Sequence, residues 1–239
     1  MLLRLPTSLS EARRCLAEGA VPVGGATLVW AQWQRDGFPE QALSLRRLPE
    51  ATVVDGETLG AAVLLHQVDE RVPEALRRAA ASVGTGAVRR TATVGGNIVG
   101  STLRCLLPPA LVLDARATVM DNEGAYEAEL AEVVAKRPLL LALRWRRPLA
   151  SAYYKAPGDL GGPPPLVVAA AVHAEGAGGR RLFTAVRDGG EVVSGSVPAP
   201  ADSDRVLDAL ESTAPGGLTG EAREAVRREV TALQRRAGD

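Results

Sequence analysis

The feature that most constrains this chain is a pair of Gly-Gly dipeptides, each of which follows a short predicted strand. Gly24-Gly25 comes after Val21–Val23, and Gly95-Gly96 comes after Thr91–Val94. Glycine leaves space where a Cβ would stand, so successive backbone N–H groups can line one phosphate-binding concavity. Either pair alone is typical of an ordinary tight turn, and neither forms the Gly-x-Gly-x-x-Gly pattern of a Rossmann site. Their meaning therefore depends on the surrounding sequence.

Composition limits the chemistry that this chain can perform. The 239 residues carry 28 Lys and Arg against 28 Asp and Glu, without the basic excess expected of a nucleic-acid-binding protein. Two cysteines and two histidines are too few for a cysteine-ligated iron–sulfur cluster or a His-rich metal site. We therefore expect no metal ligands, no nucleic-acid partner and chemistry based on an organic cofactor.

The apolar runs of the sequence argue against a membrane protein. The longest, such as Leu106–Leu113 and Leu166–Val172, fall well short of the roughly 20 residues that cross a bilayer. The N-terminus lacks the long apolar core of a signal peptide. These observations predict a cytoplasmic protein without a membrane partner.

Local patterns predict two regions that differ in their elements. In the first, Ser8 and Glu11 form a capping-box pattern that predicts a helix over Leu9–Ala17. The other elements predicted there are strands over Leu2–Leu5, Leu43–Leu48 and Thr52–Leu59, and helices over Pro73–Val83 and Pro108–Leu113. Beyond about Arg137 we predict strands over Leu141–Trp145, Ala152–Lys155, Leu166–Val172 and Leu182–Val186, then helices over Ser203–Leu210 and Glu221–Arg236. This change indicates a second unit.

The two Gly-Gly segments resemble a known family. Val23-Gly24-Gly25-Ala26-Thr27-Leu28 and the segment Val88–Ile98 resemble the two flavin loops of the FAD-binding subunit of molybdenum hydroxylases. This family includes the medium subunit of carbon monoxide dehydrogenase and the flavin domain of xanthine dehydrogenase. Further matches in the family's order are Leu45–Pro49, Leu107–Leu111, Leu113–Ala115 and Ala152–Lys155. The resemblance covers nearly the whole chain.

The resemblance implies an α+β fold with two domains. Residues 1–140 would form a two-lobed FAD-binding domain of the vanillyl-alcohol-oxidase (PCMH) type, with lobes over about 1–50 and 51–140. Residues 141–239 would form a smaller C-terminal domain of sheet and helices, similar to that of the carbon monoxide dehydrogenase flavoprotein.

The same resemblance implies FAD as the cofactor and indicates its contacts. The first loop would wrap the pyrophosphate, and the second would approach it and the ribityl chain, mostly through backbone amides. We therefore expect Gly25→Val and Gly96→Val to abolish FAD retention while the fold survives. The implied FAD-binding residues are Val23, Gly24, Gly25, Ala26, Thr27, Leu28, Thr93, Gly95, Gly96, Asn97 and Lys155. No catalytic residue is identified.

Several of these residues have two interpretations. Asn97 either donates its amide to the cofactor or is a turn residue that tolerates left-handed geometry. Lys155 either lies near the pyrimidine edge of the flavin, where a cation stabilises the anionic reduced form, or is a solvated lysine at a strand end. Trp30 and Trp33, three residues apart on a helix predicted after the first loop, either pack in the core or contact adenine.

The resemblance implies an FAD-dependent oxidoreductase subunit that relays electrons. The chain would accept electrons from an iron–sulfur partner and pass them to NAD or another acceptor. Substrate oxidation would occur at molybdopterin-bound molybdenum on a separate chain.

Departures from the family pattern favour two alternatives. The stretch Val134–Arg144 is too short to contain a loop that covers the isoalloxazine in the family, which suggests a stand-alone flavoprotein of a biosynthetic pathway. Apolar residues replace polar positions at Ala26, Leu64, Leu65 and Leu106, which suggests a non-catalytic scaffold that keeps the fold.

Overall fold

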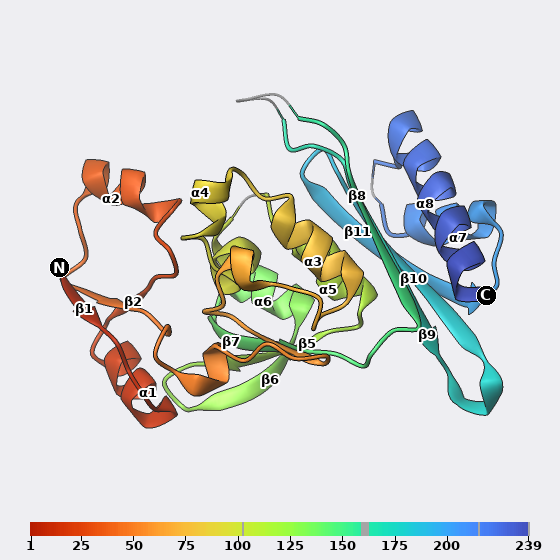
Figure 1. Cartoon of the computed structure of the whole chain (residues 1–239). Coiled ribbons are helices and arrows are strands. Elements are labelled where there is room, and N and C mark those ends of the chain that lie inside the picture. Colours follow the sequence, from red (N-terminus) through yellow and green to blue (C-terminus); the bar gives the residue numbers. More distant parts are fainter. Residues whose placement is uncertain (102, 159–162, 215, 239) are drawn as a thin grey trace. The chain divides into compact units, whose positions relative to one another are not determined.

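The computed structural model describes residues 1–101, 103–158, 163–214 and 216–238 (Figure 1). These residues divide into two compact units. The first unit comprises Met1–Val72, Val83–Arg104 and Ala115–Trp145. The second comprises Pro73–Ser82, Cys105–Asp114 and Arg146–Asp239. Two short segments from the N-terminal half of the chain therefore belong to the second unit.

The first unit begins with a small parallel sheet. Its strands are β1 (Leu2–Arg4), β3 (Gln41–Leu43) and β2 (Val21–Pro22), in the order β1-β3-β2. Helix α1 (Leu9–Ala17) follows β1, and helix α2 (Val29–Asp36) lies between β2 and β3.

Helix α1 has the predicted bounds because of its N-terminal cap. The Ser8 side chain accepts a hydrogen bond from the Glu11 N–H. The Glu11 carboxylate accepts from the Thr7 N–H at 2.8 Å, one residue before the position that a capping box would use. Ala12 and Cys15 of α1 are buried in a core cluster with Leu43.

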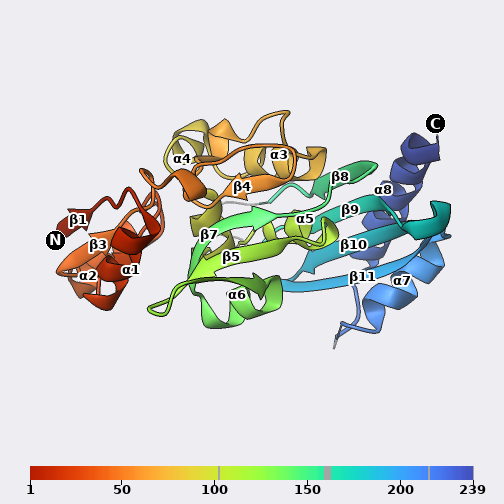
Figure 2. The ribbon, with the colours of Figure 1, turned by 90° about the horizontal axis from the view of Figure 1, so that it is seen from below.

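The second sheet of this unit is antiparallel, with the order β4-β7-β5-β6. Its strands are β4 (Thr58–Gly60), β7 (Leu139–Arg144), β5 (Arg116–Met120) and β6 (Ala125–Glu129), and helix α6 (Leu130–Lys136) packs against β5 and β6 (Figure 2). The remaining elements of the unit are single turns: η1 (Pro49–Ala51), η2 (Leu65–Gln67), α4 (Gly86–Arg89) and the π-helical turn η3 (Gly96–Gly100).

Three strands predicted for this region are wrong in whole or in part. Beyond Leu43 the chain turns, since the Leu48 N–H bonds the Leu45 carbonyl at 2.9 Å, and both leucine side chains are buried in a core cluster. In the predicted strand at 52–59, regular strand structure begins only with β4 at Thr58. Before it, Val54 forms a single antiparallel bridge with Leu59. Thr91–Val94 forms a single bridge, from Thr93 to Leu64, before helical backbone begins at residue 94.

The second unit is built around an antiparallel sheet with the order β11-β10-β9-β8. Its strands are β8 (Ala150–Lys155), β9 (Val167–Ala174), β10 (Arg180–Asp188) and β11 (Glu191–Ala199), with the 3₁₀ turn η4 (Gly176–Gly178) between β9 and β10. The helices are α3 (Glu74–Ala81), α5 (Leu107–Val112), α7 (Ser203–Glu211) and α8 (Gly220–Gly238). The strands and helices predicted for this region after residue 150 are confirmed, and β11 was missed.

Helices cover both faces of this sheet. Alternate residues of β9, such as Val168 and Val172, pack in one cluster with α7 and α8. On the other face, where α3 and α5 lie (Figure 1), the buried His173 bonds the Val112 carbonyl of α5. Burial of the His173 ring lowers its pKa. Over the described ranges, no helix combines the length and apolar character needed to cross a membrane.

Candidate functional site

The first Gly-Gly turn presents a row of unpaired backbone N–H groups. The Val23 N–H donates to the Leu43 carbonyl at 2.8 Å, which continues the pairing with β3, and the Trp30 N–H donates to the Ala26 carbonyl at 3.0 Å, which closes the first turn of α2. Between these two bonds, the N–H groups from Gly24 through Leu28 have no acceptor among the residues that the structure describes. Consecutive donors of this kind can bind an anion such as a pyrophosphate.

The backbone conformation of this turn is unusual at Ala26. Its φ is +55°, in the left-handed region that residues other than glycine seldom occupy. Residues in this region occur in the backbone concavities that turn successive N–H groups toward an anion. The turn is also accessible, because Gly24, Thr27 and Leu28 are exposed and Gly25 and Ala26 are half-buried.

The second Gly-Gly turn uses its backbone N–H groups within the protein. Val94 donates to the Val63 carbonyl at 3.0 Å and Gly95 to the Ala61 carbonyl at 2.8 Å. Gly96 donates to the Thr93 hydroxyl at 3.1 Å, and the N–H of the next residue, Asn97, bonds the Thr93 carbonyl. The N–H groups of this turn are therefore paired within the protein. A ligand would have to contact the turn through its side chains or at the Cα of Gly96.

The structure brings the two Gly-Gly turns together. A Cβ on Gly24 would overlap the Thr93 hydroxyl, and a Cβ on Gly25 would overlap the Thr91 carbonyl. These two glycines are therefore required because the first turn lies directly against the segment that leads into the second. Thr93 was among the predicted site residues, whereas Thr91 was missed because it contributes only its backbone.

The two glycines of the second turn differ in the space around them. A Cβ on Gly95 would lie 2.9 Å from the Ala61 Cβ, which is too close for unchanged packing. A Cβ on Gly96 would meet only the Thr93 hydroxyl, at 3.0 Å. Thr93 and Asn97 flank this space and are 7% and 6% exposed. Gly96 is thus the position of this turn with the most room for a ligand.

Lys155 lies in the second unit, whereas the two Gly-Gly turns lie in the first. It ends β8, and its Nζ donates to the Ser82 carbonyl at 2.8 Å. Ser82 is the C-terminal cap of α3, where a cation is stabilised by the unpaired carbonyls of the helix end. Lys155 therefore caps α3, and its predicted contact with the flavin remains a prediction.

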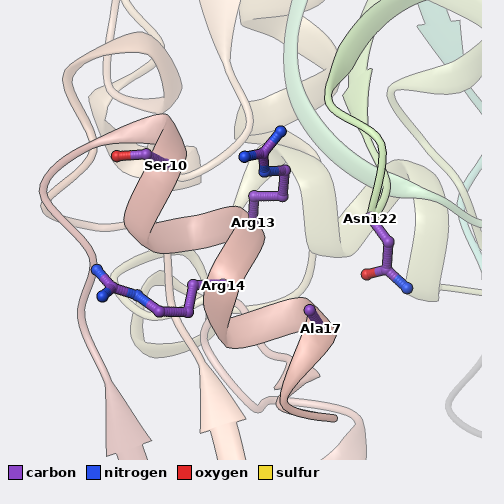
Figure 3. A pocket seen from close by; sticks show the side chains of 5 residues that line it. All are labelled: Ser10, Arg13, Arg14, Ala17 and Asn122. Carbon is purple, nitrogen blue, oxygen red and sulfur yellow. The ribbon is translucent and has the colours of Figure 1, made fainter.

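A separate hollow lies over α1 and is lined by Ser10, Arg13, Arg14, Ala17 and Asn122 (Figure 3). Arg13 donates to the Glu123 carbonyl at 3.4 Å. None of the predicted FAD-binding residues lines this hollow, so it is not part of the candidate site.

Comparison with known proteins identifies a family for this chain. The family model described as the FAD binding domain in molybdopterin dehydrogenase matches residues 3–143, which is more than half of the chain. A search of curated protein sequences found no match.

Solved structures with the same fold include those of the following three enzymes. The cyanide-inactivated Cu,Mo-CO dehydrogenase has a TM-score of 0.76 at 20% identity, and quinoline 2-oxidoreductase from Pseudomonas putida 86 has 0.75 at 17%. Carbon monoxide dehydrogenase from Hydrogenophaga pseudoflava, lacking the Mo-pyranopterin moiety, has 0.74 at 17%. Each match covers 99% of this chain and 98% of the other. These similarities confirm the predicted α+β fold class.

The family match and the unpaired amides support the same cofactor. The match includes both Gly-Gly turns, and the first turn offers the backbone donors that a pyrophosphate needs. This chain therefore belongs to the family of FAD-binding domains of molybdopterin dehydrogenases, and its cofactor is FAD.

Proposed function

We propose that this chain is the flavoprotein subunit of an oxidoreductase of the molybdenum hydroxylase type. It would take electrons from an iron–sulfur partner and deliver them to NAD or another acceptor, while a molybdopterin-containing partner oxidises the substrate. Bound FAD supplies the redox chemistry of this step. The observation that carries the proposal is the row of unpaired N–H groups from Gly24 through Leu28 in a chain of this family.

The composition supports a division of labour between chains. An iron–sulfur cluster needs about four cysteine ligands. This chain has two, Cys15 and Cys105, and both are buried and lie in different units. The cluster that delivers electrons would therefore reside on a partner, as would the molybdenum centre.

We propose different roles for the two turns in binding FAD. Residues 23–28 would hold the pyrophosphate through backbone N–H groups. The second turn would approach the pyrophosphate and the ribityl chain through Thr93, Gly95, Gly96 and Asn97. Here the cofactor would lie close to Gly96 and contact the side chains that flank it. Lys155 is proposed as a further contact at the pyrimidine edge, since an ammonium has three N–H donors and Ser82 occupies one.

We also propose that residues 1–140 form the FAD-binding domain and residues 141–239 the C-terminal domain. The family match over residues 3–143 supports the first range. The contact-defined units show that segments 73–82 and 105–114 pack with the C-terminal sheet although they precede it in sequence.

The proposal is tested by purifying the chain with the subunits encoded beside it. We expect a yellow complex that contains FAD, iron–sulfur clusters and molybdenum. The isolated chain should keep or take up FAD, and this flavin should be reduced by the reduced iron–sulfur partner. A colourless chain that fails to take up added FAD would contradict the proposed function. So would an FAD-containing chain whose flavin the reduced iron–sulfur partner does not reduce.

One observation favours a second candidate function. Helix α6 ends at Lys136 and β7 begins at Leu139, so only Arg137 and Pro138 connect them. A covering loop is implied here by the resemblance, and a two-residue connection cannot supply it. A stand-alone flavoprotein would use the open site to admit a small molecule, and a panel of reductants that bleach bound FAD without partners would support this function.

The non-catalytic scaffold has less support from the structure. Leu65 and Leu106 are 1% and 0% exposed, so both residues serve core packing. Their apolar character follows from burial and does not by itself indicate loss of cofactor contacts.

A further inference from the structure

The hollow over α1 is lined by side chains that donate hydrogen bonds. It has a volume of about 700 Å³ and lies between α1, which contributes Ser10, Arg13, Arg14 and Ala17, and the β5–β6 hairpin, which contributes Asn122 (Figure 3). All five residues belong to the first unit. Two guanidinium groups, a hydroxyl and a carboxamide supply N–H and O–H donors, and none of the five lining residues carries a carboxylate. This lining favours an anionic ligand.

The protein leaves most donors of the two arginines available. Arg13 donates one N–H to the Glu123 carbonyl at 3.4 Å. Arg14 donates no side-chain hydrogen bond to any residue that the structure describes. Because each guanidinium has five N–H groups, the pair can donate several more hydrogen bonds to a ligand.

The acidic residues of α1 are bonded outside the hollow. The Glu11 carboxylate accepts from the Thr7 N–H at 2.8 Å and from the Thr7 hydroxyl at 3.0 Å. These bonds, with a smaller contribution from the charge of Arg14, hold the pKa of Glu11 below its usual value. The Glu18 carboxylate pairs with Arg4 at 3.1 Å. The two carboxylates of α1 are therefore engaged with groups that do not line the hollow.

The hairpin on the other side of the hollow also uses its acidic side chain locally. The Asp121 carboxylate accepts from the Glu123 N–H at 2.8 Å and from the Gly124 N–H at 3.1 Å, which fixes the tip of the hairpin. Glu123 meets Arg13 through its backbone carbonyl. In a chain whose formal net charge is zero, the hollow thus keeps two positive charges with no carboxylate among its lining residues.

The two arginines face different parts of the hollow. Consecutive residues of a helix are about 100° apart around its axis, whereas residues four apart lie on one side. Ser10 therefore shares a side with Arg14, and Ala17 shares a side with Arg13, which reaches the hairpin that carries Asn122. Figure 3 shows the two arginine side chains leaving α1 in different directions. One phosphate does not contact both guanidinium groups in this arrangement, but a molecule with two separated phosphates does.

We propose that this hollow is a binding site for a small organic bisphosphate. One phosphate would bind Arg13 and Asn122, and the other would bind Arg14 and Ser10. A guanidinium binds phosphate through two parallel charge-assisted hydrogen bonds, and a phosphate ester offers three acceptor oxygens and up to two negative charges. The volume of the hollow lies in the range of small-molecule sites. The site is separate from the two Gly-Gly turns, and the inference does not rest on the proposed function.

The test compares two sugar phosphates that differ by one phosphate group. Titration calorimetry on the full chain, before and after addition of FAD, should show fructose bisphosphate binding at one site at least tenfold more tightly than fructose monophosphate. Arg13→Gln and Arg14→Gln should each raise the Kd for the bisphosphate about tenfold, because each variant loses one phosphate contact. Addition of FAD should leave the Kd for the bisphosphate within about twofold.

Two further variants separate this site from general charge effects. Ala17→Glu adds a carboxylate on the side of Arg13, at an exposed position where glutamate is a good helix former, and should weaken the bisphosphate as much as Arg13→Gln. Arg35→Gln removes an exposed arginine from α2 and is the matched control, which should change neither Kd. Helix α2 buries none of its residues, and Trp30 is 49% exposed, so the predicted packing of Trp30 in the core is wrong and this control disturbs no core. Circular dichroism checks the fold of each variant.

Several results would overturn the inference. Bisphosphate that binds no more tightly than monophosphate would remove the two-phosphate site. Equal weakening by Arg35→Gln would show attraction to the charge of the chain alone. Loss of bisphosphate binding on addition of FAD would place the phosphates at the unpaired N–H groups of the first Gly-Gly turn. Each of these results leaves the proposed function standing, whereas a chain that takes up no FAD but binds the bisphosphate would contradict only the proposed function.

Discussion

The two Gly-Gly turns share a dipeptide, and the first lies against the segment that leads into the second, but their backbone N–H groups are bonded differently. In the first, N–H groups from Gly24 through Leu28 have no acceptor among the described residues. In the second, the N–H groups of Gly95 and Gly96 bond the Ala61 carbonyl and the Thr93 hydroxyl. The same dipeptide therefore leaves its backbone N–H groups unpaired in one turn and bonded within the protein in the other.

The glycines are also required for different reasons. Gly24 and Gly25 allow one segment of the protein to touch another's backbone or side chain, whereas a Cβ on Gly96 would meet only the Thr93 hydroxyl, at 3.0 Å. Substitution of each position consequently tests a different property, either the contact between the turns or the approach of the cofactor.

Gly25→Ala should have the largest effect. Its Cβ would overlap the Thr91 carbonyl, which is backbone and cannot rotate away. We expect a loss of about 3 kcal/mol in the free energy of unfolding together with loss of FAD binding. Urea denaturation followed by circular dichroism measures the first, and FAD titration the second. This expectation replaces the one from sequence, in which the fold survives substitution of Gly25. Unchanged stability would show that the two turns do not touch.

Gly96→Ala should separate binding from stability. The new methyl group would meet only the Thr93 hydroxyl, and alanine restricts the unfolded chain, so the free energy of unfolding should stay within about 1 kcal/mol of wild type. The methyl group would occupy the space that the cofactor approaches, and we expect the Kd for FAD to rise about tenfold, which corresponds to about 1.4 kcal/mol. Parallel titrations and denaturation curves test this. Full FAD affinity would restrict the cofactor contact to the first turn.

The sequence predicted elements best where local signals agree with burial. Helix α1 was predicted with its bounds because Ser8 caps it, and β9 was predicted because Val167–Val172 is a continuous apolar run buried on both faces. Strand β6 was missed because its sequence, Ala125–Glu129, is almost wholly exposed and carries no apolar run.

The sequence drew attention to both Gly-Gly turns, but it did not predict how differently their N–H groups are bonded. Gly24 and Gly96 look alike in the sequence, since each belongs to a glycine pair after a short predicted strand. The acceptors that occupy the second turn include the carbonyls of Ala61 and Val63, which belong to a segment well before this turn in the sequence. No periodicity or spacing encodes such a pairing.

Thr93→Val tests the bracing of the second turn. Thr93 is 7% exposed, and its hydroxyl accepts the Gly96 N–H at 3.1 Å. Valine keeps the shape but leaves this N–H unpaired, so we expect a loss of about 1 kcal/mol in the free energy of unfolding and a few-fold rise in the Kd for FAD. Thr93→Ser restores the acceptor and should recover most of both. A loss in the serine variant with none in the valine variant would show that the methyl group, rather than the hydroxyl, braces the turn.

Lys155→Met should have the smallest effect and extends the comparison to the second unit. Like the amides of the second turn, the Lys155 Nζ has a partner within the protein, the Ser82 carbonyl at 2.8 Å. Loss of this cap on α3 should lower the free energy of unfolding by about 0.5–1 kcal/mol. If Lys155 also faces the flavin, removal of its charge disfavours the reduced anion, and the midpoint potential of the bound FAD should fall by about 30 mV, the equivalent of about 1.4 kcal/mol for a two-electron couple. Lys155→Arg keeps the cation and should preserve the potential. A stability loss without a shift in potential would make Lys155 a helix cap alone, because a residue remote from the flavin cannot change the relative stability of its two redox forms.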